Sequence, residues 1–286
     1  MPYAVVSGAS SGIGYNLALI LAKRGFKVYG GAPEHTLKAM EPLKQHGVVP
    51  FPLDISKVES VQKAVEFFKD HSGSDQLDLL YNNAGIANGG PGFEFEDQEM
   101  LDIFAVNVTG HILMTKYFSS LVIQAKGTIV FTASVAAIVP LSWTSLYCST
   151  KAAIDAYAKG IRPELEPYGV RVYSIITGGI DTPIAQPKMG EISQRVTELP
   201  YHIPGLEESI RASAGMTKTG TQPFKYAERV LNKVLKGYRG FNIYEGHRAG
   251  LLKFMSRWLP LWLQYFLIGS FFKQRKPLAE IRKRFR

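Results

Sequence analysis

Residues 3–14 read Tyr3-Ala-Val-Val-Ser-Gly8-Ala-Ser-Ser-Gly12-Ile-Gly14, a short apolar run that leads directly into a glycine-rich loop. The stretch from residue 14 to residue 24 has the apolar spacing of an amphipathic helix. Glycine allows a tight turn and a close approach of the backbone to a ligand, and a helix N-terminus attracts phosphate. This order predicts a nucleotide-binding turn in which Gly8, Gly12 and Gly14 approach the ligand. A glycine-rich turn without a ligand is the alternative.

Short apolar runs and helix-period segments alternate along the chain, which is the pattern of a parallel sheet built from βαβ units. We therefore predict an α/β fold, a doubly wound parallel sheet of the Rossmann type. The strands are expected at 3–7, 26–30, 48–51, 77–81, 128–133, 170–176 and 241–244, and the helices at 14–24, 57–70, 98–124 and 145–166. The second of these helices opens with Ser56-Lys-Val-Glu59, which is typical of a capping box.

The length of 286 residues fits one large domain with an appendage. We expect residues 1–249 to form this domain and residues 250–286 to form a tail. Residues 184–225 contain four prolines and little periodicity, which favours an excursion that covers a substrate over a separate domain.

Composition excludes several classes of protein. The single cysteine, Cys148, allows no disulfide within the chain, and the six histidines form no HExxH-type spacing, so we expect no metal site. The N-terminus has no basic segment followed by an apolar stretch, so no cleavable signal peptide is predicted and we expect exposure to the cytosol. Of the net charge of +9, the segment 273–286 carries seven Lys/Arg and one Glu, or +6, which leaves +3 for the rest.

Two further stretches fit the nucleotide site. Asp54 ends the third predicted strand, where a carboxylate can accept a hydrogen bond from an adenine amino group. Asn82-Asn83-Ala84-Gly85 follows the fourth strand, where small residues let the backbone approach a ribose. Taken alone, the second stretch could be an ordinary turn.

Tyr147 is the one tyrosine of fourteen that has a lysine four residues later, Lys151. On a helix this spacing places both side chains on one face. An unperturbed tyrosine has a pKa near 10, and a neighbouring ammonium favours the phenolate and lowers that pKa. Ser134 ends an apolar strand thirteen residues earlier, where it can hydrogen-bond a substrate oxygen. An isolated pair of this spacing is more often a surface pair, so the neighbouring motifs decide.

In this order, Ser7–Gly14, Asn82–Gly85, Asn107, Ser134 and Tyr147–Lys151 resemble the signature of the short-chain dehydrogenase/reductase family over roughly residues 3–250. The resemblance implies an NAD(P)-dependent oxidoreductase in which Tyr147 is the acid or base and Lys151 tunes it and holds the nicotinamide ribose. It also implies that Ser134 polarises the carbonyl and that Asn107 supports a proton-relay water.

By the same resemblance, further contacts with the cofactor are expected at Ile13, Asp54, Asn83, Lys116, Ile180 and Thr182. The family usually has Pro-Gly after the sixth strand, whereas this chain reads Thr177-Gly-Gly-Ile-Asp-Thr182, which leaves that turn less constrained. Residues 53–57, 77–85, 126–132 and 176–179, together with the aromatic tail, are similar to fungal 1-acyldihydroxyacetone-phosphate reductases of the endoplasmic reticulum and lipid droplets.

The choice between NADP(H) and NAD(H) depends on the end of the second strand. An NAD enzyme normally presents an acid there, and Ala32 occupies the place. NADP-preferring relatives have arginines where Pro33 and Glu34 stand. Ser10, Ser11 and His35 remain as candidates to contact a 2′-phosphate, and the sequence favours NADP(H) over NAD(H).

The tail contains fifteen uncharged residues, Trp258 to Phe272, followed at once by the basic run. Fifteen residues are too few to span a bilayer as a helix. Aromatic residues beside basic ones favour a monotopic anchor on a cytosol-facing membrane surface, as on endoplasmic reticulum or lipid droplets. The alternative is a helix that closes the substrate pocket or a dimer interface, and both roles could coexist.

Three functions therefore remain open. The first is an NADPH-dependent reductase of a lipid ketone, such as 1-acyldihydroxyacetone phosphate. The second is an oxidoreductase of hydroxysteroids, retinoids or fungal secondary metabolites, and the third is a catalytically silent, nucleotide-sensing scaffold. Nucleic-acid binding is disfavoured because the positive charge follows an apolar segment instead of lining a groove. A homo-oligomer is compatible with the sequence.

Overall fold

The computed structural model describes residues 1–182, 184, 196–200, 202–214 and 220–286. Their core is a parallel sheet of seven strands in the order β3-β2-β1-β4-β5-β6-β7. The strands are β1 (Tyr3–Ser7), β2 (Lys27–Ala32), β3 (Val49–Pro52), β4 (Leu79–Asn82), β5 (Thr128–Ser134), β6 (Arg171–Thr177) and β7 (Asn242–Glu245). The order steps outward from β1 in both directions, so the doubly wound Rossmann-type fold predicted from the sequence is confirmed.

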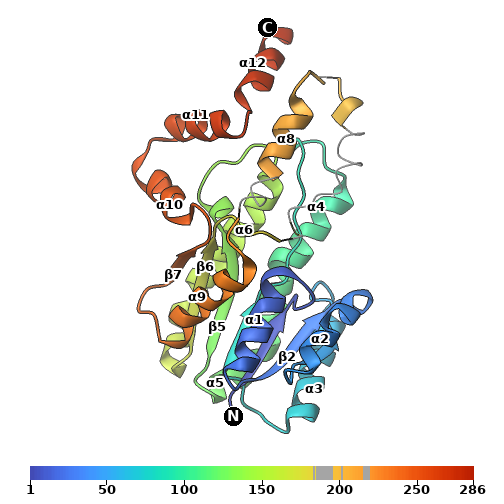
Figure 1. Cartoon of the computed structure of the whole chain (residues 1–286), viewed down its shortest axis with the longest axis vertical. Coiled ribbons are helices and arrows are strands. Elements are labelled where there is room, and N and C mark those ends of the chain that lie inside the picture. Colours follow the sequence, from blue (N-terminus) through green and yellow to red (C-terminus); the bar gives the residue numbers. More distant parts are fainter. Residues whose placement is uncertain (183, 185–195, 201, 215–219) are drawn as a thin grey trace.

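Helices cover both faces of the sheet (Figure 1). One face packs against α3 (Val58–Ser72), α5 (His111–Gln124) and α6 (Ser145–Leu165), through buried side chains such as Phe118 and Ile154. The other face packs against α1 (Gly12–Lys23) and α9 (Pro223–Leu235), through Leu17 and Val230 among others. Each such side chain contributes about 1.5–3 kcal/mol of transfer free energy, so the two apolar layers fix the sheet between them.

Shorter elements connect the strands and helices. Residues between β2 and β3 form η1 (Glu34–Met40) and α2 (Glu41–Lys44), and β5 leads into η3 (Val135–Ala137). The connection from α6 to β6 is η4 (Glu166–Tyr168).

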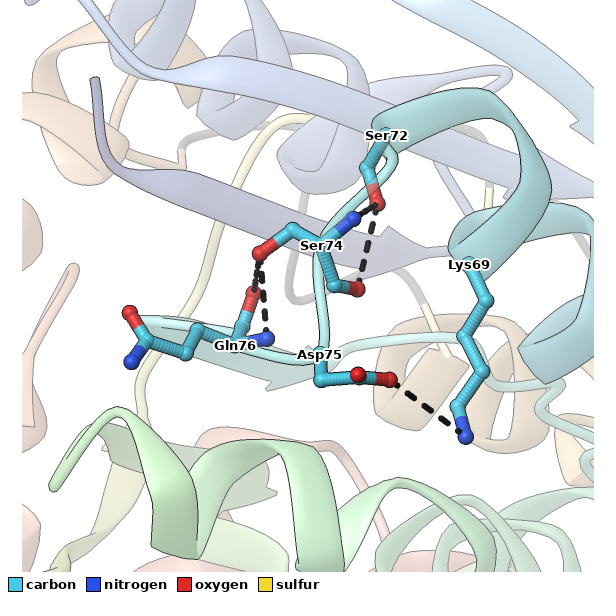
Figure 2. A network of polar contacts seen from close by, with 5 residues as sticks. All are labelled: Lys69, Ser72, Ser74, Asp75 and Gln76. Carbon is cyan, nitrogen blue, oxygen red and sulfur yellow. Dashed lines mark hydrogen bonds and ion pairs between the residues drawn. The ribbon is translucent and has the colours of Figure 1, made fainter.

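The turn from α3 to β4 lies at the edge of the sheet where β4 begins, and a set of local hydrogen bonds fixes it (Figure 2). The backbone N–H of Ser74 donates to Ser72 Oγ at 3.1 Å, and the N–H of Gln76 donates to Ser74 Oγ at 3.1 Å. Lys69 and Asp75 form an ion pair of 3.7 Å across the turn. These contacts hold the start of β4 in place, and the position of β4 in turn determines where Asn83 and Ala84 follow its other end.

The predicted capping box at residues 56–59 is wrong. Helix α3 begins at Val58, and its N-cap residue, Lys57, makes no capping hydrogen bond through its side chain. The Ser56 hydroxyl donates to Asp54 Oδ1 at 2.6 Å instead, because that carboxylate lies within two residues of it. Ser and Asp side chains commonly form such local bonds in competition with helix caps.

The single helix predicted over 98–124 is interrupted. Helix α4 (Asp97–Phe104) ends at a π-helical turn, η2 (Ala105–Gly110), and α5 begins at His111. The turn contains Asn107, which is fully buried. π-helical turns occur frequently at functional sites.

The last part of the chain lies beyond the end of the sheet where the strands finish (Figure 1). Helix α8 (Leu206–Ala214) belongs to the predicted excursion, most of which before α8 falls outside the described residues. The tail forms α10 (Ala249–Trp258), α11 (Leu261–Phe271) and α12 (Arg275–Arg284). Among the described helices, none combines the length and apolar character that crossing a membrane requires.

Candidate active site

A cavity of about 410 Å³ opens at the carboxyl ends of the strands. Most of the residues predicted to bind the cofactor or to take part in catalysis line it: Gly8, Ser10, Ser11, Gly12, Ile13, Asp54, Asn83, Ser134, Tyr147, Lys151, Ile180 and Thr182. Ligands of open α/β sheets bind at this edge, close to the point where the strand order reverses. The geometry therefore gathers residues from the whole length of the sheet into one site.

The glycine loop is held against the segment that follows β4. Ser7 Oγ accepts hydrogen bonds from the backbone N–H groups of Asn83 at 3.0 Å and Ala84 at 3.1 Å. Gly8 has a φ of +69°, and a Cβ at that position would lie 2.8 Å from the Ala84 Cα. A side chain at Gly14 would run into the Gly8 carbonyl oxygen. Both positions therefore require glycine, and the loop backbone remains open toward the cavity.

This cradle fits the pyrophosphate of a dinucleotide. Helix α1 begins at Gly12, so its positive N-terminal end faces the cavity where Ser10 and Ser11 line it. Ser11 is the N-cap residue, and its hydroxyl makes no capping bond to the helix. The backbone N–H groups at a helix N-terminus can donate hydrogen bonds to a phosphate, and the neighbouring glycines have no side chain to block its approach.

Leu53, Asp54 and Ile55 line the end of the cavity where the adenine is expected. Partial burial raises the pKa of the Asp54 carboxyl, but hydrogen bonds from Ser56 and the charge of Lys57 outweigh it and hold the pKa below the usual value. The carboxylate is therefore ionised at neutral pH. It is available as a hydrogen-bond acceptor, as the sequence suggested.

The three candidate catalytic side chains come together from β5 and α6. Lys151 Nζ lies 5.6 Å from the centroid of the Tyr147 ring and donates to the Thr132 carbonyl oxygen at 2.9 Å. Ser134 Oγ accepts from the backbone N–H of Ala136 at 3.1 Å. The one-turn spacing on α6 thus places the phenol and the ammonium on the same side of the cavity.

The electrostatics of this group differ from the expectation. Burial raises the pKa of Tyr147 to about 12, and the Ser134 hydroxyl opposes that shift only in part. Burial also lowers the pKa of Lys151 to about 8. The lowered pKa expected for Tyr147 is not found in this environment, because desolvation of the phenolate is the largest influence on it. At neutral pH the phenol holds its proton.

Asn107 does not line the cavity. Its amide nitrogen donates to the Ile86 carbonyl oxygen at 2.8 Å and to Thr150 Oγ1 at 3.1 Å, while its Oδ1 accepts from the Ile86 N–H at 2.9 Å. A Cβ added to Gly85 would lie 3.3 Å from Asn107 Oδ1 and 3.6 Å from Lys151 Nζ. Asn107 therefore positions the wall beside Lys151, and its role with a relay water stays a prediction.

Two other predicted contacts lie away from the cavity surface. Lys116 is exposed on α5, with its ammonium 5.0 Å from the Tyr117 ring centroid. It does not line the cavity where contact with the cofactor was expected. Gly14 lies one residue beyond the lining, beneath the loop.

The turn after β6, where the family usually has proline, is fixed by backbone hydrogen bonds from Gly178 to Glu245 (2.8 Å) and from Gly179 to His247 (3.1 Å).

Sequence reasoning missed several residues of the site. Ser7 joins the two loops through its hydroxyl, and its position at the very end of β1 was the available signal. Thr36 lines the cavity, whereas His35 is exposed and does not. Ser213 on α8 reaches the cavity from a segment without any sequence motif. Among the described residues, no group of three or more His, Cys, Asp or Glu side chains could hold a metal ion.

A dinucleotide cradle, a carboxylate at its adenine end and a Ser–Tyr–Lys group in the cavity wall together define a nucleotide-dependent oxidoreductase. The family description "short chain dehydrogenase" matches residues 2–192, and the chain belongs to this family, as its motifs predicted. It is an NAD(P)-dependent oxidoreductase.

The chain is similar to named relatives over most of its length. It is 36% identical over 271 residues to the NADPH-dependent 1-acyldihydroxyacetone phosphate reductase of Saccharomyces cerevisiae, covering 91% of this chain and 87% of the relative. It is 30% identical to the short-chain dehydrogenase virD of Hypocrea virens, covering 92% and 91%. A short chain dehydrogenase of Burkholderia cenocepacia, solved in complex with NADP, superposes with a TM-score of 0.70 at 26% identity, covering 93% of this chain and 97% of that one.

Proposed function

We propose that this oxidoreductase reduces the ketone of a lipid-like substrate and uses NADPH. The observation that carries the proposal is a protonated phenol, Tyr147, in a cavity whose wall beyond the catalytic group is mostly apolar. That part of the wall includes Ile86, Val106, Val135 and Leu141. An apolar cavity with a few convergent polar groups is the usual form of a site for a largely apolar small molecule.

The site residues divide the reaction between them. Bound NADPH supplies the hydride that forms the new C–H bond at the carbonyl carbon. The Ser134 hydroxyl hydrogen-bonds the carbonyl oxygen, and the Tyr147 phenol donates its proton to that oxygen as the C=O π bond breaks. Tyr147 holds its proton at neutral pH, so it can act as the proton donor in the reduction. The Lys151 ammonium stabilises the phenolate until a proton from solvent restores the phenol.

Two features support NADP(H) over NAD(H). The carboxyl end of β2 carries Ala32, whose side chain is fully buried, so no carboxylate there repels a 2′-phosphate. Ser10, Ser11 and Thr36 line the neighbouring part of the cavity and can donate hydrogen bonds to phosphate oxygens. The name of the Saccharomyces relative, which is NADPH-dependent, agrees with this preference.

The same relative suggests 1-acyldihydroxyacetone phosphate as the substrate, with 1-acylglycerol 3-phosphate as the product. The apolar side chains of the cavity wall could pack against the acyl chain of this substrate. Among the described lining residues, Lys151 is the one Lys or Arg, and it already donates to Thr132, so the substrate phosphate would lie at the mouth near the basic tail. A neutral ketone, such as a steroid or a secondary metabolite, fits the same wall without that requirement.

Oxidation of NADPH, followed by absorbance, tests the choice between these substrates. If the proposal is correct, kcat/KM for acyldihydroxyacetone phosphate exceeds that for its dephosphorylated form and for steroid ketones. A preference for the dephosphorylated ketone would favour the alternative of a neutral substrate. No turnover of any ketone, despite binding of NADPH, would support a silent scaffold.

We also propose that the tail rests on a cytosol-facing membrane surface, such as that of the endoplasmic reticulum or a lipid droplet. Several of its apolar side chains are turned outward: Trp258 and Trp262 are each 68% exposed, and Leu261, Phe266 and Phe271 are about half exposed. Arg248 and Arg275 lie 4.2 Å from the rings of Phe271 and Phe266. Aromatic side chains interleaved with cations are suited to the interface of an anionic lipid surface.

A further inference from the structure

A buried hydrogen-bond network joins the tail to the substrate end of the cavity. Gln274 Nε2 donates to Ser213 Oγ at 2.9 Å and approaches the Ser142 carbonyl oxygen at 3.5 Å. Trp143 Nε1 donates to Ser209 Oγ at 2.9 Å, and Ser213 Oγ donates to the Ser209 carbonyl oxygen at 3.0 Å. All four side chains that make these bonds are more than nine-tenths buried. Three segments far apart in the chain are therefore tied together away from water.

The network holds part of the cavity wall. Ser213 lines the cavity itself, and Leu141 and Thr144 line it on either side of the segment that the network binds. Between them, Trp143 has a φ of +68°, a conformation that a bulky side chain rarely adopts. Such a backbone persists only where its surroundings hold it in place, and the indole bond to Ser209 is one such restraint. Tyr147 follows four residues later on α6.

Gln274 differs from the other buried glutamine of the tail. The side chain of Gln264 donates to the Leu259 carbonyl oxygen at 2.9 Å, so its bond stays within the tail. Gln274 lies just after the exposed apolar helix α11, is only 2% exposed, and directs its amide away from the tail into the wall. A buried amide bonded to a cavity-lining hydroxyl restrains that hydroxyl, because breaking the bond leaves both groups unsatisfied.

We propose that Gln274 is a positioning residue of the substrate site. Through Ser213 and the segment 141–144, it fixes the end of the cavity that receives the part of the substrate beyond the reacting ketone. The proposal rests on the ketone reduction proposed above. Gln274 does not line the cavity, so its loss changes the recognition of long substrates and leaves the cofactor and the proton donor unaffected.

The full-length variants Gln274→Leu and Gln264→Leu provide a matched comparison, because each removes a buried glutamine amide of the tail. Gln274→Leu loses the bond to Ser213 and the longer one to Ser142, and Gln264→Leu loses the bond to Leu259. The probes are 2-hexanone and 2-decanone, with NADPH oxidation followed by absorbance. We expect Gln274→Leu to lower kcat/KM for 2-decanone about five- to tenfold, the equivalent of one lost hydrogen bond, mainly through KM. For 2-hexanone, for the KM of NADPH and for Gln264→Leu, we expect changes below about twofold.

The variant Ser213→Ala removes the acceptor from the same bond. It should likewise lower kcat/KM for 2-decanone relative to that for 2-hexanone. In the double variant, the loss in free-energy units should be smaller than the sum of the two single losses. If Gln274→Leu does not fold, Ser213→Ala alone decides. The proposal is wrong if the ratio of kcat/KM for 2-decanone to that for 2-hexanone is the same in Gln274→Leu as in Gln264→Leu. It is also wrong if kcat/KM falls equally for both ketones and the KM of NADPH rises with it, as a purely structural role predicts.

The failure of the proposed reduction is distinguishable from the failure of this inference. A wild-type enzyme that oxidises no NADPH with any ketone would contradict the reduction. Calorimetric binding of 2-decanone to the protein with NADP⁺ then measures the effect of Gln274→Leu without turnover. Equal binding by the two glutamine variants in that assay would overturn the positioning role.

Discussion

Replacing Lys151 with methionine should stabilise the fold while it destroys the activity. Lys151 is 2% exposed, and burial lowers its pKa from 10.5 to about 8. The difference, 10.5 − 8 = 2.5, corresponds to about 3 kcal/mol for holding the ammonium in the interior at neutral pH, at roughly 1.4 kcal/mol per pKa unit. Loss of the bond to the Thr132 carbonyl offsets about 1 kcal/mol of this gain. We therefore expect a net stabilisation of about 2 kcal/mol.

The pH dependence gives the prediction its signature. Between pH 8 and 10.5 the unfolded wild type binds this proton while the folded protein has released it, so the wild type gains stability with rising pH from this group. Below pH 8 both states are protonated and the full cost is present. The advantage of Lys151→Met should therefore be greatest at and below neutral pH, fall to zero at about pH 10 and reverse above it.

Urea unfolding at pH 7, 8.5 and 9.5, without cofactor, measures this difference as a free energy of unfolding. Lys116→Met serves as the control, because Lys116 is exposed on α5 and should show no such dependence on pH. A Lys151→Met protein that is less stable than wild type at pH 7 would refute the reasoning. So would an advantage that is the same at pH 7 and pH 9.5.

Three further predictions concern chemistry, cofactor and tail. Tyr147→Phe should lower kcat by about 10²–10⁴-fold and leave the Kd of NADPH unchanged, so more than about a tenth of wild-type activity would contradict its role as proton donor. Pro33→Arg, at an exposed residue that lines the cavity, should lower the KM of NADPH roughly tenfold and leave that of NADH unchanged, which steady-state kinetics with both cofactors checks. Trp258→Ser with Trp262→Ser should reduce sedimentation with anionic liposomes, whereas Tyr168→Ser, an exposed aromatic outside the tail, should not; equal loss in both would contradict docking through the tail.

The strands were predictable because each is an apolar run bounded by turn residues. All seven lie within two residues of their predicted limits. The errors are at the ends, where pairing with distant segments decides. Leu77, for example, was predicted to start a strand, but its N–H donates to the Leu121 carbonyl oxygen, and β4 begins only at Leu79. Buried parallel strands carry their signal in composition, whereas their limits depend on tertiary contacts.

The interruption of the predicted helix at 98–124 has the same origin. Its apolar spacing is helical throughout, and nothing local predicts a π-helical turn at Ala105–Gly110. Asn107 lies in that turn and uses both ends of its amide on the backbone of Ile86, twenty-one residues away. A contact of that range is invisible to a reading based on periodicity.

The candidate catalytic residues could be named from their spacing, but their electrostatics could not. The spacing of Tyr147 and Lys151 correctly places them on one face of α6, and from that local view the ammonium should lower the pKa of the phenol. The desolvation of both groups is a property of the whole fold, and for Tyr147 it raises the pKa instead of lowering it. Spacing therefore predicts which groups meet, and packing decides the pKa of each.

The two expectations for the tail, a membrane anchor and a cover for the pocket, are compatible with each other. From the sequence, the uncharged segment was either a membrane anchor or a cover for the pocket. In the structure its side chains separate by face: Ile268 and Phe272 are buried against the enzyme, as is Gln274 just beyond the segment, whereas Trp258 and Trp262 are exposed. The inner face packs against the enzyme, so the proposed contact with a membrane is left to the outer face, where Trp258 and Trp262 lie. A substrate with an acyl chain would then enter the site beside the surface in which it is dissolved.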